Sequence, residues 1–226
     1  WLPRPFEVSV AELASAAGIQ VPGGGPQLGA NEDGRRAAGR ILEEAGIGAG
    51  DDFVLAAVGG RPGSAKAAPS ETWRALLETF RAESSVPVLL TSGPGEEERL
   101  QALMDFGLPE GVTSTSGGAT ELEALIGLLE RASAFVAADS GPRHLAAAMG
   151  RPSVVLHGPT DPRHSGMTGA PIRSSRLEVP CGPCHLEKCP LSGSEHLACF
   201  GLDHVASAVA MLYELLASEA EDITCH

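Results

Sequence analysis

Several features common in other protein classes are scarce in this sequence, and each shortage excludes a class. Aromatic residues make up only 4% of the 226 residues, which argues against a stacking surface for single-stranded nucleic acid. Basic residues number 16 against 29 acidic residues, so the net charge is −13. Because such a surface repels phosphate backbones, we expect no nucleic-acid partner and only a local phosphate site.

Long apolar runs are scarce as well. No uninterrupted run approaches the roughly 20 residues of a membrane helix, and no basic-then-apolar signal segment opens the chain. Five cysteines are too few for a secreted disulfide scaffold. We therefore expect a cytoplasmic protein. The chain begins at Trp1 rather than at methionine, so we also expect that its natural N-terminal part is missing.

Short apolar segments alternate with helical ones after residue 30. Segments of strand length lie at residues 53–58, 86–90, 135–138 and 153–156, with weaker ones at 112–115 and 177–179. Helices are expected at residues 31–45, from Ser70 as N-cap onward, and at 96–106, 121–131, 144–149 and 204–216. The helix at 121–131 should bury Leu122, Leu125, Ile126 and Leu129. Such alternation predicts an α/β fold, a Rossmann-like, doubly wound parallel sheet that binds ligands at the carboxyl ends of its strands.

The first 30 residues are rich in proline and glycine, including Gly23-Gly24-Gly25. We interpret them as irregular, the remnant of a preceding domain and its linker. Residues 31–226 are then a single domain.

The first strong strand runs into a glycine-rich loop, Gly59 to Lys66. Its exposed amides, with Ser64 and Lys66, could hold a diphosphate. The spacing is that of neither a Walker loop nor a G-x-G-x-x-G loop. A flexible loop with a solvated lysine is the alternative interpretation.

A second loop follows the strand at 135–138. Asp139 stands at the carboxyl end of that strand, Ser140 is a natural N-cap, and Pro142 fits the start of a helix. The amides near Ser140 and Gly141 would then form an anion site, with His144 in the first helical turn. The alternative is a plain cap and turn. The convergence of an acid, a helix N-terminus and a histidine favours a site.

These motifs resemble those of glycosyltransferase family 9, the heptosyltransferases that use ADP-heptose. The resemblance rests on DSGPRHLAAAMGRP at 139–152 and VVLHGPTDP at 154–162, supported by PGSAK-x-x-P at 62–69 and LTSGPGEEER at 90–99. It covers about residues 52–216. It implies the C-terminal, donor-binding half of a GT-B enzyme, an inverting transferase whose base, an aspartate, belongs to the N-terminal acceptor domain.

The resemblance also implies roles for individual residues. Lys66 would neutralise the donor's diphosphate, Glu96 would bind the ribose hydroxyls with Glu97 and Glu98 as competitors, and Asp139 would contact the sugar. The remaining donor-binding positions are Gly63, Ser64, Ser140, Gly141, His144 and Thr160. The chemistry needs no cofactor.

The resemblance further implies a glycan or glycolipid acceptor of lipopolysaccharide type, which would bring the enzyme to the inner face of the membrane. The sequence departs from the family's pattern at Ala67, Ala68 and His157, where aromatic residues are common; these departures bear on the identity of the donor. The loop at 157–172, with Asp161, Arg163 and His164 and with Gly158, Gly166 and Gly169 as hinges, could close over the donor.

Four cysteines cluster as Cys181-x2-Cys184-x4-Cys189-x9-Cys199. Four thiolates within twenty residues could bind a structural zinc ion. Reduced or disulfide-paired cysteines that staple a loop are the alternative, and Cys225 lies apart in the polar tail.

Two other functions stay open from the sequence. One is a non-catalytic nucleotide-binding module, and the other is a different nucleotide-sugar enzyme on the same two-domain plan, such as an epimerase.

Overall fold

A six-stranded parallel sheet forms the centre of the molecule. The computed structural model describes residues 6–20, 27–165 and 171–223. The strands run in the order β3-β2-β1-β4-β5-β6, and every neighbouring pair is parallel. Their bounds are β1 Val54–Ala57, β2 Val88–Ser92, β3 Val112–Ala119, β4 Ala134–Ala138, β5 Ser153–His157 and β6 Ile172–Arg176. This order reverses between β1 and β4, so the predicted Rossmann-like sheet is confirmed.

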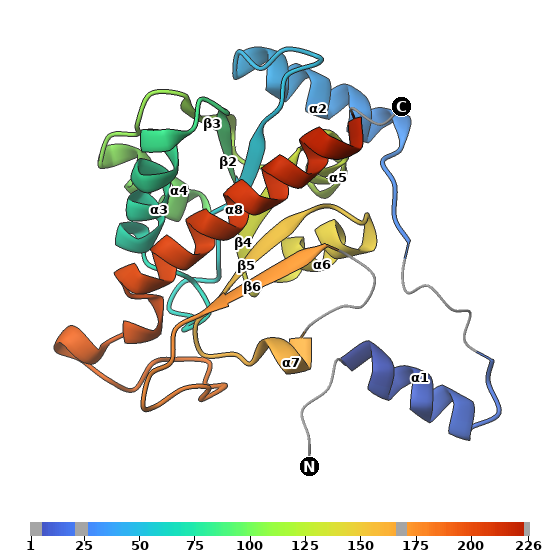
Figure 1. The fold of residues 1–226 in the computed structure, drawn as a ribbon, viewed down its shortest axis with the longest axis vertical. Coiled ribbons are helices and arrows are strands. Elements are labelled where there is room, and N and C mark those ends of the chain that lie inside the picture. Colours follow the sequence, from blue (N-terminus) through green and yellow to red (C-terminus); the bar gives the residue numbers. More distant parts are fainter. Residues whose placement is uncertain (1–5, 21–26, 166–170, 224–226) are drawn as a thin grey trace.

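Helices cover both faces of the sheet (Figure 1). Their bounds are α1 Phe6–Ala16, α2 Glu32–Glu44, α3 Ser70–Glu83, α4 Glu97–Asp105, α5 Leu122–Arg131, α6 Gly141–Ala148, α7 Pro162–Ser165 and α8 Leu202–Ile223, with short 3-10 turns at Gly193–Glu195 and Ala198–Phe200. One face packs against α3, α4 and α8, where Trp73 and Leu212 are buried. The other packs against α2, α5 and α6, where Leu42 and Leu128 are buried.

Two glycines allow α2 and α5 to pack closely. A Cβ atom on Gly127 would lie 2.2 Å from the backbone oxygen of Gly34, and one on Gly34 would lie 2.5 Å from that of Glu123. Backbone cannot move aside as a flexible side chain can. This contact therefore needs glycine at both positions.

The structure corrects four local expectations. Residues 6–16 form α1, because Pro3 and Pro5 precede that helix rather than interrupt it. The last strand lies at 172–176, not 177–179, since this edge strand is polar and half exposed and shows no apolar run. Leu122 is 58% exposed, and the N-cap of α3 is Pro69, one residue before Ser70.

The segment Ala198–Ser218, which includes most of α8, is long and apolar enough to cross a membrane by length and composition. The search for uninterrupted apolar runs did not find this segment, because its apolar residues are interspersed with polar ones. Val205, Ala208, Leu212 and Leu215 are buried against the sheet, and Figure 1 shows α8 lying across one face. We therefore interpret α8 as a core helix.

Candidate functional site

The loops that follow β1, β2 and β4 meet at one edge of the sheet and enclose a cavity. Its volume is about 100 Å³. The lining consists of Ala57, Gly59, Thr91, Ser92, Gly93, Glu96, Thr120, Leu125, Ser140, Gly141 and Pro142. Strand order explains the convergence, because β1 and β4 lie at the reversal of the sheet, where parallel α/β folds bind ligands.

The N-terminus of α6 faces this cavity with free hydrogen-bonding capacity. Ser140 occupies the N-cap position in extended conformation, as predicted, and Pro142 lies in the first turn. The Ser140 hydroxyl donates to the carbonyl oxygen of Ala138 at 3.2 Å instead of capping the helix amides. The amides that begin α6 can therefore receive an anion, aided by the positive end of the helix dipole.

Asp139 brings two cations together beside that helix end. The Nε atom of Arg143 lies 2.6 Å from Oδ1 of Asp139, and the Nζ atom of Lys66 lies 3.7 Å from Oδ2. The side chains of Arg143 and Asp139 are 1% and 5% exposed, whereas that of Lys66 is 49% exposed. The fold thus brings the glycine-rich loop that carries Lys66 into contact with Asp139.

Neighbouring groups hold Asp139 ionised. Burial by itself would raise the pKa of Asp139, but the charge of Arg143, a hydrogen bond from Thr160 and the nearby His157 and Lys66 outweigh it and lower the pKa. The Nδ1 atom of buried His157 lies 3.1 Å from the Thr160 hydroxyl. Because that hydroxyl donates to Asp139, His157 must donate from Nδ1, which assigns its neutral tautomer. Burial, with the charge of Arg143, lowers the pKa of His157 to about 4.

His144 lies on the first turn of α6, next to Arg143, and is exposed. Partial burial and the charge of Arg143 lower its pKa, with Asp139 acting in the opposite direction. The histidine is therefore mostly neutral at neutral pH, and it can offer a hydrogen bond without adding a full charge.

Glu96 is the one of the three consecutive glutamates that lines the cavity. Its Oε2 atom accepts from the amide of Gly93 at 3.0 Å. A Cβ atom on Gly59 would lie 1.8 Å from Oε2, so only glycine leaves room for this carboxylate. Glu97 and Glu98 are exposed, and the geometry therefore favours Glu96 among the competitors.

The predicted phosphate loop is braced by the cysteine-containing segment. Gly63 has a φ of +74°, a conformation that favours glycine. The Ser64 hydroxyl accepts from the amide of Lys66 at 3.3 Å. The amide of Ala65 donates to the carbonyl oxygen of Glu187 at 2.7 Å. Segment 181–199 thus supports the loop that carries Lys66.

The four clustered cysteines line a second cavity, of about 80 Å³, which Ala65 of that loop also lines. All four are free thiols. Burial, with the neighbouring thiols, raises the pKa of Cys199 to about 11. Within the described residues, no three His, Cys, Asp or Glu side chains are arranged to hold a metal ion, so the zinc prediction is not supported.

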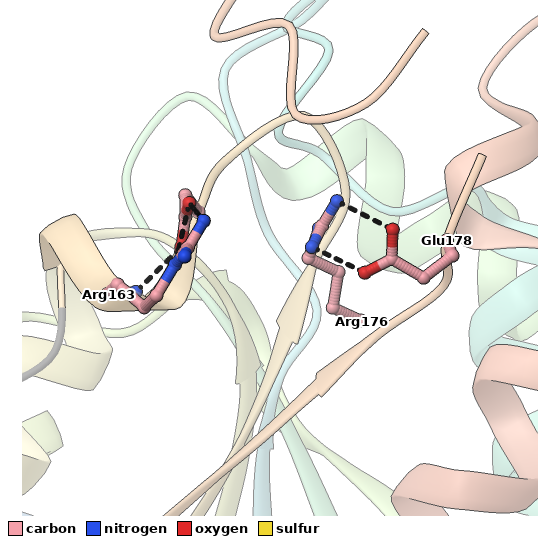
Figure 2. Close-up of polar contacts among 4 residues, drawn as sticks. Arg163, Arg176 and Glu178 are labelled. Atoms are coloured by element: carbon pink, nitrogen blue, oxygen red, sulfur yellow. Dashed lines mark hydrogen bonds and ion pairs between the residues drawn. The ribbon is translucent and has the colours of Figure 1, made fainter. Parts of the chain in front are cut away.

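Figure 2 shows two arginine–carboxylate pairs, one in the loop and helix that follow β5 and one at the end of β6. Arg163, on α7, donates to Asp161 from Nη2 at 2.6 Å, and this hydrogen bond is the main reason that the pKa of Asp161 falls to about 2. Arg176, at the end of β6, donates to Glu178 at 2.8 Å. The expected closure of loop 157–172 remains a prediction, since Gly166 and Gly169 lie outside the described residues.

A sequence model described as glycosyltransferase family 9 (heptosyltransferase) matches residues 7–194. The chain belongs to glycosyltransferase family 9. Lipopolysaccharide heptosyltransferase 1 of Escherichia coli K12 is 38% identical over 96 residues, which are 42% of this chain and 28% of that protein. The Pseudomonas aeruginosa enzyme of the same name is 31% identical over 127 residues, which are 56% of this chain and 35% of that protein.

Solved structures from family 9 share the fold. ADP-heptose LPS heptosyltransferase II of E. coli superimposes with a TM-score of 0.68 at 22% identity, covering 91% of this chain and 57% of that one. A family 9 glycosyltransferase from Veillonella parvula gives 0.72 at 19% identity, covering 96% and 61%. The chain thus spans less than two thirds of these relatives. At such identities the likeness shows the fold alone.

Sequence reasoning missed the burial of Arg143 and several cavity-lining residues. Arginine is normally exposed, so its burial was not expected. The one indication in the sequence was the i,i+4 spacing of Arg143 from Asp139, which is typical of an ion pair. Thr91 and Thr120, whose hydroxyls are hydrogen-bonded to each other, also line the cavity. Only the strand order, which places β2 beside β1 and β3 beside β2, would have revealed them.

Proposed function

We propose that this chain carries the donor-binding part of an inverting heptosyltransferase that transfers heptose from ADP-heptose to a lipopolysaccharide-type acceptor. One observation carries the proposal: Lys66, Asp139 and the N-terminus of α6 meet beside a cavity that Glu96 lines. Membership of family 9 and the names of the relatives, which include ADP-heptose LPS heptosyltransferase II, support the same donor and acceptor. We assign the donor-binding domain to residues 31–226 and residues 1–30 to the remnant of an N-terminal acceptor domain and its linker.

The proposed chemistry needs the site to accept negative charge. As the acceptor hydroxyl attacks C1 of the heptose, its proton passes to the aspartate base expected in the N-terminal acceptor domain. The bond from C1 to the diphosphate oxygen breaks, and charge accumulates on the departing ADP. Lys66 and the amides of Ser140 and Gly141 would stabilise that charge. Gly63 and Ser64 would shape the phosphate loop, Glu96 would bind the ribose hydroxyls, and Asp139, held by Thr160, would orient the sugar.

The cavity has both the apolar and the polar surface that a nucleoside requires. Ala57, Leu125 and Pro142 provide apolar surface for a base, and the Glu96 carboxylate provides an acceptor for hydroxyl groups. The proposal assigns the diphosphate to protein cations and amides, with no role for a cofactor. We place the enzyme in the cytoplasm, near the inner membrane face, where a lipopolysaccharide precursor would be presented.

Calorimetry with nucleotide sugars tests this proposal. ADP-heptose should bind saturably, in the presence of EDTA as well as in its absence, and at least about tenfold more tightly than UDP- or GDP-sugars. Tighter binding of a UDP- or GDP-sugar would favour a different nucleotide-sugar enzyme. Binding of ADP with no gain from the heptose would favour a non-catalytic nucleotide-binding module. Absence of binding to all of them would overturn the proposal.

A further inference from the structure

Asp139 contacts two cations that differ in burial and in distance. The guanidinium of Arg143 is 1% exposed and lies 2.6 Å from Oδ1, whereas the ammonium of Lys66 lies 3.7 Å from Oδ2 on a side chain that is 49% exposed. Arg143 is therefore the fixed partner of the carboxylate. Lys66 is held loosely and can reorient toward a ligand.

Asp139 and the two cations in contact with it together carry an excess of one positive charge. Asp139 carries one negative charge, and Arg143 and Lys66 carry one positive charge each. The nearby Asp161 does not change this count, because it is paired with Arg163. If Arg143 were absent, Asp139 and Lys66 would form a neutral pair, and an incoming anion would have to compete with the carboxylate for the ammonium.

The position of Arg143 is unfavourable for stability alone. Its guanidinium is fully buried on the first turn of α6, where the helix dipole disfavours a cation. An apolar side chain of similar length would fill the same space without the desolvation cost of a buried ion pair. The arrangement thus indicates a role in the charge of the site.

We propose that Arg143 is a positioning residue that holds and balances the Asp139 carboxylate, so that the positive charge of Lys66 remains available for the diphosphate of the donor. This inference rests on the proposed function, because it takes the crevice as a diphosphate site. Arg143 itself is too buried to contact the donor, and in this proposal it acts through Asp139.

A double-mutant cycle on ADP affinity tests the inference. Arg143→Met should weaken ADP binding by roughly tenfold, since Asp139 then competes for Lys66. Asp139→Asn should bind ADP at least as tightly as the wild type. The double variant Arg143→Met/Asp139→Asn should regain most of the lost affinity, because no carboxylate remains to hold Lys66. A purely structural role for Arg143 would not be rescued by Asp139→Asn.

Melting curves of each variant show whether it is folded. If Arg143→Met does not fold, Arg143→Lys is used in its place. Because the lysine side chain is shorter, it holds Oδ1 of Asp139 less firmly. We expect its ADP affinity to fall about threefold, and Asp139→Asn should again restore it. Unchanged ADP affinity in a folded Arg143 variant, or a loss that Asp139→Asn does not restore, would overturn the inference alone. Failure of the wild type to bind ADP would instead overturn the proposed function, and this inference with it.

Discussion

The Nε atom of Arg143 lies 2.6 Å from Oδ1 of Asp139, and both side chains are almost completely buried. Asp139→Ala would leave the guanidinium buried without its carboxylate. We expect the free energy of unfolding, measured by urea denaturation, to fall by about 3–5 kcal/mol. Asp139→Asn should cost less, because its amide oxygen can still accept a hydrogen bond from Arg143.

Asp33→Ala is the matched control for that measurement. Asp33 pairs with Arg36 on α2 at 3.2 Å, but both side chains are mostly exposed, so we expect a loss below about 1 kcal/mol. Equal losses for Asp33→Ala and Asp139→Ala would contradict the view that burial makes the Asp139 pair important.

Gly59 provides the space that the Glu96 carboxylate occupies. Gly59→Ala should displace this flexible side chain rather than the backbone, so the stability should change by less than about 1 kcal/mol. ADP affinity should nevertheless fall several-fold, because the proposed contact with the ribose is lost. Gly39→Ala, on α2 with no atom within 4 Å of the added methyl, is the control. Unaltered ADP binding by Gly59→Ala would count against the role of Glu96.

His157 should make the fold sensitive to mild acid. Its pKa is lowered to about 4 in the folded protein, whereas an unfolded histidine titrates near 6.5. The unfolded state therefore binds the proton more readily between these values, and stability falls as pH drops from about 6.5 to 4. The linked loss is roughly 3 kcal/mol.

Denaturation of His157→Gln across this pH range should show a smaller loss than the wild type. The exposed His196→Gln is the matched control and should follow the wild-type curve. If His157→Gln also follows that curve, His157 is not buried in its neutral form.

Gly127 sets the distance between α5 and α2. Gly127→Ala places a methyl carbon 2.2 Å from the backbone oxygen of Gly34, and the two helices must separate to accept it. We expect the free energy of unfolding to fall by about 1–3 kcal/mol, although alanine favours helix formation more than glycine does. A stabilised Gly127→Ala variant would show that this packing is looser than described.

The alternation of apolar strands and amphipathic helices was enough to predict the central sheet. Its inner strands are buried on both faces, so their sequences are nearly continuous apolar runs, as at Phe53–Val58. The edge strand β6 escaped prediction because its sequence, Ile172–Arg176, is polar and partly exposed. Helix α1 escaped because the neighbouring prolines and glycines dominated the pattern.

The site was predictable only in part. Lys66 and Asp139 are 73 positions apart in the sequence, yet their meeting follows from the rule that loops at the carboxyl ends of adjacent parallel strands converge. The burial of Arg143 does not follow from any local pattern. It depends on the packing of α6 against β4 and β5, which places the side chain beside Asp139.

The most direct test of the account compares the affinities of ADP and AMP for three proteins by calorimetry. In the wild type, ADP should bind roughly tenfold more tightly than AMP, because Lys66 and the start of α6 hold the second phosphate. Lys66→Ala should lose most of this preference, whereas Lys188→Ala, at an exposed lysine of the cysteine segment, should keep it. Equal affinities for ADP and AMP in the wild type, or an undiminished preference in Lys66→Ala, would contradict the assignment of this crevice as a diphosphate site.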